Sequence, residues 1–104
     1  MQYLVIGQHP PDLCPAANEK IRTLATEGGK EMPALAEKLG VKILATYVPM
    51  TNHMVVVAVE ADDADKVREF AFQGRLSQWN TVEIYQTSTL EEALARVQEM
   101  PMIY

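Results

Sequence analysis

The run His53-Met54-Val55-Val56-Val57-Ala58-Val59 is apolar at both odd and even positions, and it constrains the fold more than any other segment. Successive side chains of a strand point to opposite faces of its sheet, so a strand of this composition needs apolar cover on both faces. β-Branched residues also favour strands. The run therefore predicts a central strand in a sheet that is covered on both sides.

Three further strands are predicted over residues 3–6, 41–48 and 81–87. The run at 3–6 is also apolar throughout and fits a second central strand. The run at 81–87 alternates, with Val82 and Ile84 on one face and Glu83 and Tyr85 on the other, which is typical of an edge strand. A turn at 49–52 joins the strand at 41–48 to the strand at 53–59 as a hairpin.

Helical patterns lie between these strands and after the last one. The first begins near Pro15, which suits the first turn of a helix, and it ends at Gly40. Gly28 and Gly29 interrupt it, which predicts either one kinked helix or two shorter ones. A second helix spans about residues 63–73, and a capping box that begins at Thr89 starts a short last helix through about residue 97.

The element order predicts an α+β fold of the ferredoxin-like βαββαβ type, with one domain over residues 1–104, a short C-terminal helix and an antiparallel sheet of order 4-1-3-2. Its two long helices can cover only one face of the sheet. The simplest cover for the other face is a second copy of the chain, so we predict a homodimer. The alternative cover is the C-terminal helix with the apolar tail at 100–104.

Charge and cysteine content exclude some classes of protein. The formal net charge is −5, and an acidic chain disfavours binding to nucleic acid. No apolar segment is long enough for a membrane span or a signal peptide. The chain has one cysteine, so no intrachain disulfide can form, and a lone thiol predicts a reducing, cytoplasmic location.

Three segments carry a resemblance to a known family. They are Leu35-Ala36-Glu37-Lys38-Leu39-Gly40-Val41-Lys42, Val55 to Ala61, and Trp79 to Ile84 followed by Thr89-Leu90-Glu91-Glu92-Ala93. Together they resemble the GYD-type domains and their small relatives of unknown function. The resemblance implies a dimeric α/β-barrel fold, and it implies no activity.

The predicted topology gathers most of the chemically versatile side chains at one end of the sheet. The loop after the first strand, the hairpin and the start of the fourth strand meet there, and they bring His9, Cys14, Tyr47, Met50, His53, Met54, Trp79 and Asn80. This end is therefore the candidate site.

Different functions are consistent with these residues. A small-molecule site would use Tyr47, Met50, Trp79 and Asn80, and a metal site for copper or zinc would use His9, Cys14 and His53.

A cofactor-free or thiol-dependent enzyme would use His9, His53 or Cys14 in a reaction that the sequence does not identify. A structural protein that assembles through its tail is the third hypothesis. The competing interpretation of Cys14 is a small, buried hydrophobic residue.

Overall fold

The four strands form one antiparallel sheet of the predicted order. A computed structural model describes residues 1–49 and 51–104 of the chain. Within these residues, the sheet contains β1 (Gln2–Gln8), β2 (Lys42–Tyr47), β3 (Met54–Glu60) and β4 (Thr81–Thr87), in the order β2-β3-β1-β4. This is the order 4-1-3-2 counted from the other edge, so the ferredoxin-like prediction is confirmed. The apolar strands β1 and β3 lie in the centre.

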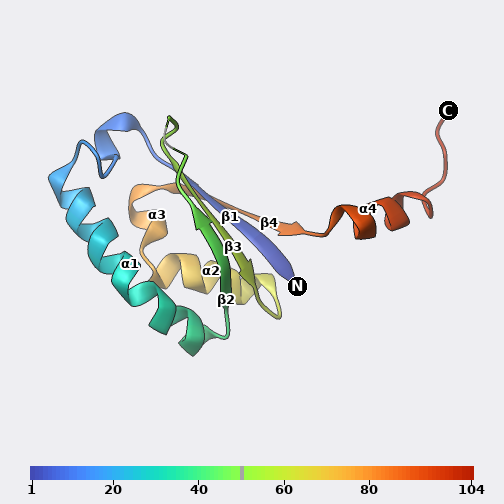
Figure 1. The fold of residues 1–104 in the computed structure, drawn as a ribbon, viewed down its shortest axis with the longest axis horizontal. Helices are drawn as coiled ribbons and strands as arrows, with labels where there is room; N and C mark the ends of the chain where they lie inside the picture. Colours follow the sequence, from blue (N-terminus) through green and yellow to red (C-terminus); the bar gives the residue numbers. More distant parts are fainter. Residues whose placement is uncertain (50) are drawn as a thin grey trace.

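The helices are η1 (Pro11–Leu13), α1 (Glu19–Leu39), α2 (Ala64–Gln73), α3 (Leu76–Trp79) and α4 (Leu90–Val97). Figure 1 shows α1, α2 and α3 on one face of the sheet. Helix α1 runs without a break through Gly28 and Gly29, which selects the single long helix of the two alternatives. It ends at Gly40, whose φ of 73° lies in the left-handed region that glycine favours.

The predicted start of α1 near Pro15 is wrong. The helix begins at Glu19, because the side chain of Asn18 accepts a hydrogen bond of 3.1 Å from the backbone N–H of Ile21 and caps the first turn. Pro15 lies in the turn between η1 and α1. Asp63 caps α2 in the same way. Thr89 caps α4, as the sequence predicts.

The core lies between the sheet and α2. Tyr3 and Val5 of β1 point to the same face as Val57 and Val59 of β3, and all four are buried. Helix α2 contributes its buried residues Val67, Phe70 and Ala71 to this layer, and Leu76 and Trp79 of α3 extend it toward one end of the sheet.

The other face of the sheet is apolar at its centre, with Glu83 and Tyr85 of the edge strand β4 beside Ile6 and Leu4, and no helix among the described residues covers it. It carries Leu4 and Ile6 of β1 opposite Ala58 and Val56 of β3. Helix α4 extends away from the body instead of folding back (Figure 1). The radius of gyration is accordingly 16.0 Å, against about 13 Å for a compact domain of 100 residues.

The projecting α4 leaves an apolar stripe exposed. Leu90, Leu94 and Val97 recur at helical spacing, and their side chains are 75%, 54% and 60% exposed. The C-terminal helix therefore does not cover the sheet within one chain. No helix among the described residues has the length and apolar character needed to cross a membrane.

Candidate functional site

The sheet register places both histidines side by side on the helix-covered face. Gln8 pairs with Met54 and with Thr81 at the last position of each ladder. The next residues, His53, His9 and Asn80, therefore form a row across the end of the sheet. The backbone N–H of His9 donates to the carbonyl of His53 at 3.1 Å, which holds the hairpin to the end of β1.

The side chain of Asn80 orients the imidazole of His9. Its Nδ2 donates to the carbonyl of Leu76 at 3.1 Å, so its Oδ1 points to the Nδ1 of His9, 2.8 Å away. A carbonyl oxygen only accepts, so Nδ1 carries the proton, and Nε2 of the neutral ring keeps a free lone pair. This Nε2 is buried and has no hydrogen-bond partner among the described residues.

Gly7 makes room for this arrangement. It precedes the row on the same face of β1, and a Cβ atom built on it would lie 3.0 Å from Cγ of Asn80. Trp79 also packs beside the imidazole of His9, with its ring centroid 5.0 Å from that of His9. The His9 side chain is thus held by packing as well as by its hydrogen bond, and only 9% of the residue is exposed.

Cys14 lies in the loop between η1 and α1 and not at the N-terminus of a helix, where the predicted helix start near Pro15 would place it. Its N–H donates to Pro11, and its carbonyl accepts from Ala17 and Asn18, both at 2.9 Å. Arg22 of α1 also donates to the carbonyl of Pro15 at 2.8 Å. The loop's own hydrogen bonds therefore fix the backbone of the half-buried Cys14.

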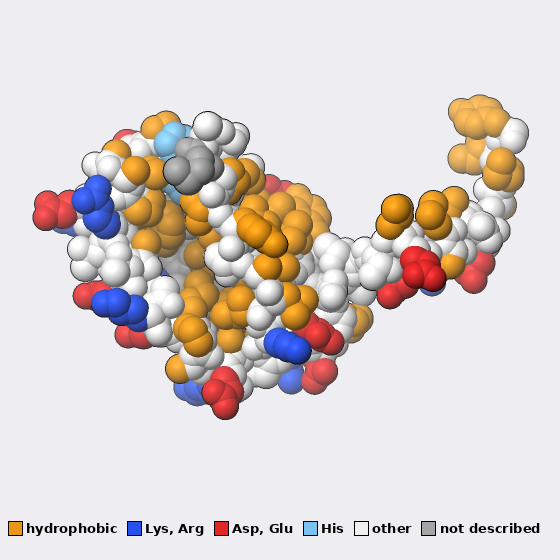
Figure 2. Space-filling model, viewed as in Figure 1, with side chains coloured by type: hydrophobic (Ala, Val, Ile, Leu, Met, Phe, Trp, Pro, Cys, Tyr) orange, Lys and Arg blue, Asp and Glu red, His pale blue; other side chains and the backbone are white. Residues whose placement is uncertain are grey.

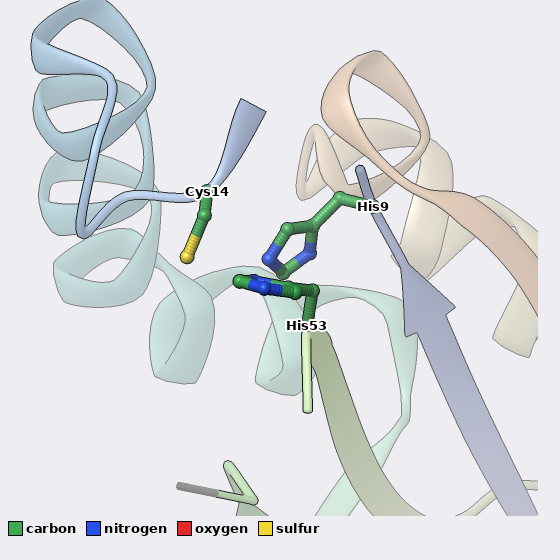
Figure 3. Close-up of side chains that lie close together, drawn as sticks. All are labelled: His9, Cys14 and His53. Carbon is green, nitrogen blue, oxygen red and sulfur yellow. The ribbon is translucent and has the colours of Figure 1, made fainter. Parts of the chain in front are cut away.

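Three potential metal ligands converge at this end of the sheet. One donor atom each from His9, Cys14 and His53 lies within 4.8 Å of the others. Figure 3 shows the sulfur of Cys14 beside the two imidazole rings. His53 is exposed and its ring centroid lies 5.8 Å from that of His9. Sequence reasoning named all three residues, and the fold brings them together.

A large hollow adjoins these side chains. It has a volume of about 830 Å³ and lies between α1 and the sheet. Figure 2 shows hydrophobic side chains around it and histidine at one end. The volume falls within the range of small-molecule pockets, about 300–1,000 Å³.

The structure separates the other predicted site residues. Trp79 lines the hollow. Asn80 is buried behind His9 and acts on it through the hydrogen bond. Tyr47 is 65% exposed and pairs with Val56, which points to the uncovered face. Met50 lies outside the described residues.

Two features of the site were not identified from the sequence. The first is Gly7, for which a glycine inside a strand, a common sign of close approach, was the available signal. The second is the part of α1 that lines the hollow, including Ala25, Gly28, Gly29 and Met32. The two glycines interrupt an apolar helical pattern, and from the sequence they predict only a kink or a break in the helix.

Comparison of the chain with models of known protein families and with curated protein sequences finds no match. The resemblance to GYD-type domains therefore stays a prediction.

Proposed function

We propose that this chain is a homodimeric protein that binds a transition-metal ion of the zinc or copper class through His9, Cys14 and His53. The observation that carries the proposal is the buried Nε2 of His9, which has no partner among the described residues and lies in a cluster of three donor atoms within 4.8 Å. A buried polar atom without a partner costs about 1–3 kcal/mol, and a bound cation would remove that cost.

The donor set supports zinc or copper over other ions. Imidazole nitrogen and thiolate sulfur are the ligands that these ions prefer, whereas calcium and magnesium select oxygen. Donor atoms around a tetrahedral zinc ion are separated by about 3.5 Å. His53 is exposed and Cys14 is half-buried, so both side chains can rotate to reach that spacing around the fixed His9.

The surroundings of His9 also support a metal ligand. Metal-binding histidines usually donate their second ring N–H to a carbonyl or carboxylate, which fixes the tautomer that binds the ion. Asn80 supplies such an acceptor at 2.8 Å. Three protein ligands leave a fourth position open, which is the pattern of catalytic rather than structural zinc sites.

Metal binding can be tested on the purified, reduced protein. After removal of bound metal, titration with Co²⁺ is expected to reach one ion per chain and to give a thiolate-to-cobalt charge-transfer band. Competition with Zn²⁺ should remove the band.

The variants His9→Ala, Cys14→Ala and His53→Ala should each weaken binding by at least about 100-fold. Asn52→Ala, next to His53 in the same hairpin, should bind as the wild type does.

A Cys14→Ala variant with unchanged affinity would contradict the proposed ligand set. A chain that takes up no metal would leave the cofactor-free or thiol-dependent enzyme as the hypothesis to test, with His9 and Cys14 as its groups.

The homodimer is supported by the uncovered apolar face of the sheet. Leu4, Ile6, Val56 and Ala58 form its centre. A contiguous apolar face of this kind is rare on a monomer in water. The proposed partner is the same face of a second copy, and the exposed stripe of α4 would reach across to pack on that copy.

A further inference from the structure

The cavity beside His9, Cys14 and His53 has apolar walls along its length. The side chains that line it from both layers include Leu24, Met32, Ile43, Val55, Val57 and Leu76. The polar groups His9, Cys14 and His53 also line it, and they lie close together. The cavity therefore combines a concentrated polar end with an apolar body.

Helix α1 spans this cavity rather than packing tightly on the sheet. Of its 21 residues, Ala36 alone is fully buried, and it lies near the C-terminal end of the helix. Leu24 and Ala25, in the N-terminal half, belong to the apolar side of the helix but remain partly exposed. Their apolar surface borders the cavity and is available to an occupant.

Gly28 and Gly29 line the cavity at the middle of α1. A glycine inside a helix costs about 1 kcal/mol relative to alanine. Neither residue has a positive φ, so the backbone does not require glycine at these positions. A Cβ atom on Gly29 would meet nothing within 4 Å. Gly29 therefore leaves open space at the cavity. A Cβ atom on Gly28 would instead lie 3.6 Å from the carbonyl oxygen of Gly74.

We infer that the cavity binds an amphiphilic organic molecule whose head group carries a nitrogen, oxygen or sulfur donor and whose apolar tail lies under α1. The donor would complete the coordination of the ion held by His9, Cys14 and His53, so this part rests on the proposed function. The tail depends only on the cavity, whose volume of about 830 Å³ accommodates a medium-sized ligand.

The test uses a series of 1-alkylimidazoles with one head group and tails of increasing length. Binding of 1-methyl-, 1-butyl- and 1-octylimidazole to the cobalt-loaded protein is followed through the visible cobalt spectrum. Each buried methylene is expected to tighten binding by about fourfold, so the octyl compound should bind at least tenfold more tightly than the methyl compound.

A substitution in the cavity wall tests binding of the tail independently of binding of the metal. Gly29→Leu places a side chain where a Cβ has open space, so the chain is expected to fold and to bind cobalt normally. The preference for the octyl compound should fall to less than threefold. Thr26→Leu, an exposed position of α1 outside the cavity lining, is the matched control and should keep the full preference.

The failures of the two proposals can be distinguished. Normal cobalt binding without any chain-length preference would overturn the inference and leave the metal site standing. A preference that Gly29→Leu does not change, or that disappears when residues 88–104 are deleted, would place the tail outside the cavity and also overturn it. A wild-type protein that does not bind cobalt would overturn the metal site together with the coordinated head group.

Discussion

Nδ1 of His9 and Oδ1 of Asn80 lie 2.8 Å apart at the end of the sheet, and this contact decides which nitrogen of the imidazole is free. Asn80 is itself fixed by its hydrogen bond to Leu76. The pair therefore presents Nε2 of His9, with its lone pair, toward Cys14 and His53.

Removal of the Asn80 side chain is expected to weaken metal binding without removing a ligand. Asn80→Ala frees the imidazole of His9 to rotate and to change tautomer, and loss of such a partner typically costs 10–100-fold in metal affinity. Asn80→Asp keeps an oxygen that accepts from Nδ1 but loses the donor to Leu76, so it should lose less affinity than Asn80→Ala. Competition with a chromophoric chelator measures all three proteins, and equal affinity for Asn80→Ala and the wild type would contradict the positioning role.

Gly7→Ala should also lower the affinity for metal, because it displaces the side chain of Asn80 without removing it. The added methyl group would lie 3.0 Å from Cγ of Asn80 and would push its amide away from His9. We expect a metal affinity about tenfold lower. Gly29→Ala is the matched control, since its methyl group meets nothing within 4 Å. If both alanine variants bind metal equally well, the packing of Gly7 against Asn80 does not support the site.

A charge on the uncovered sheet face should dissociate the proposed dimer. Val56 lies in the middle of β3, between Ile6 and Tyr47 on the neighbouring strands. Val56→Glu would bury an unpaired carboxylate at the proposed interface, so light scattering should report a monomer. Thr26→Glu on the exposed side of α1 should leave the dimer intact. A wild-type monomer at micromolar concentration would contradict the proposed interface.

Tyr85 should lose its phenolic proton at a higher pH than an ordinary tyrosine does. Its hydrogen bond to Glu83 and the negative charge of Glu83 raise the pKa of Tyr85 above its ordinary value of 10.0. The folded chain then keeps this proton at a pH where the unfolded chain has lost it. The free energy of unfolding should therefore fall as the pH rises from about 10 through the raised pKa.

Glu83→Ala removes the hydrogen bond and the charge, so the pKa of Tyr85 should return toward its ordinary value. Ultraviolet titration of tyrosinate measures the change, and Glu60→Ala is the control. The same titration curve for Glu83→Ala and the wild type would rule out this interaction.

The order of the strands and the meeting of His9, Cys14 and His53 could be predicted because both follow from topology. Apolar runs identified β1 and β3 as central strands, and the antiparallel register then put His9 beside His53. The environment of Cys14 could not be predicted in this way. Its loop is organised by the cap at Asn18 and by Arg22, and these contacts depend on three-dimensional geometry.

The cavity could not be predicted from the sequence, for a different reason. Apolar spacing in α1 indicates which side faces the sheet, but it does not report the distance between helix and sheet. Gly28 and Gly29 suggested a kink, whereas the structure keeps α1 continuous and uses both residues to line the cavity. Tyr47 shows the same limit, because its position at the end of β2 did not reveal which face it occupies.

X-ray absorption spectroscopy of the zinc-loaded protein tests the metal site most directly. We predict one sulfur at about 2.3 Å and two imidazole nitrogens at about 2.0–2.1 Å from the zinc ion, with the sulfur contribution lost in Cys14→Ala. A first shell of oxygen and nitrogen alone, unchanged by Cys14→Ala, would contradict the assignment of His9, Cys14 and His53 as the metal ligands.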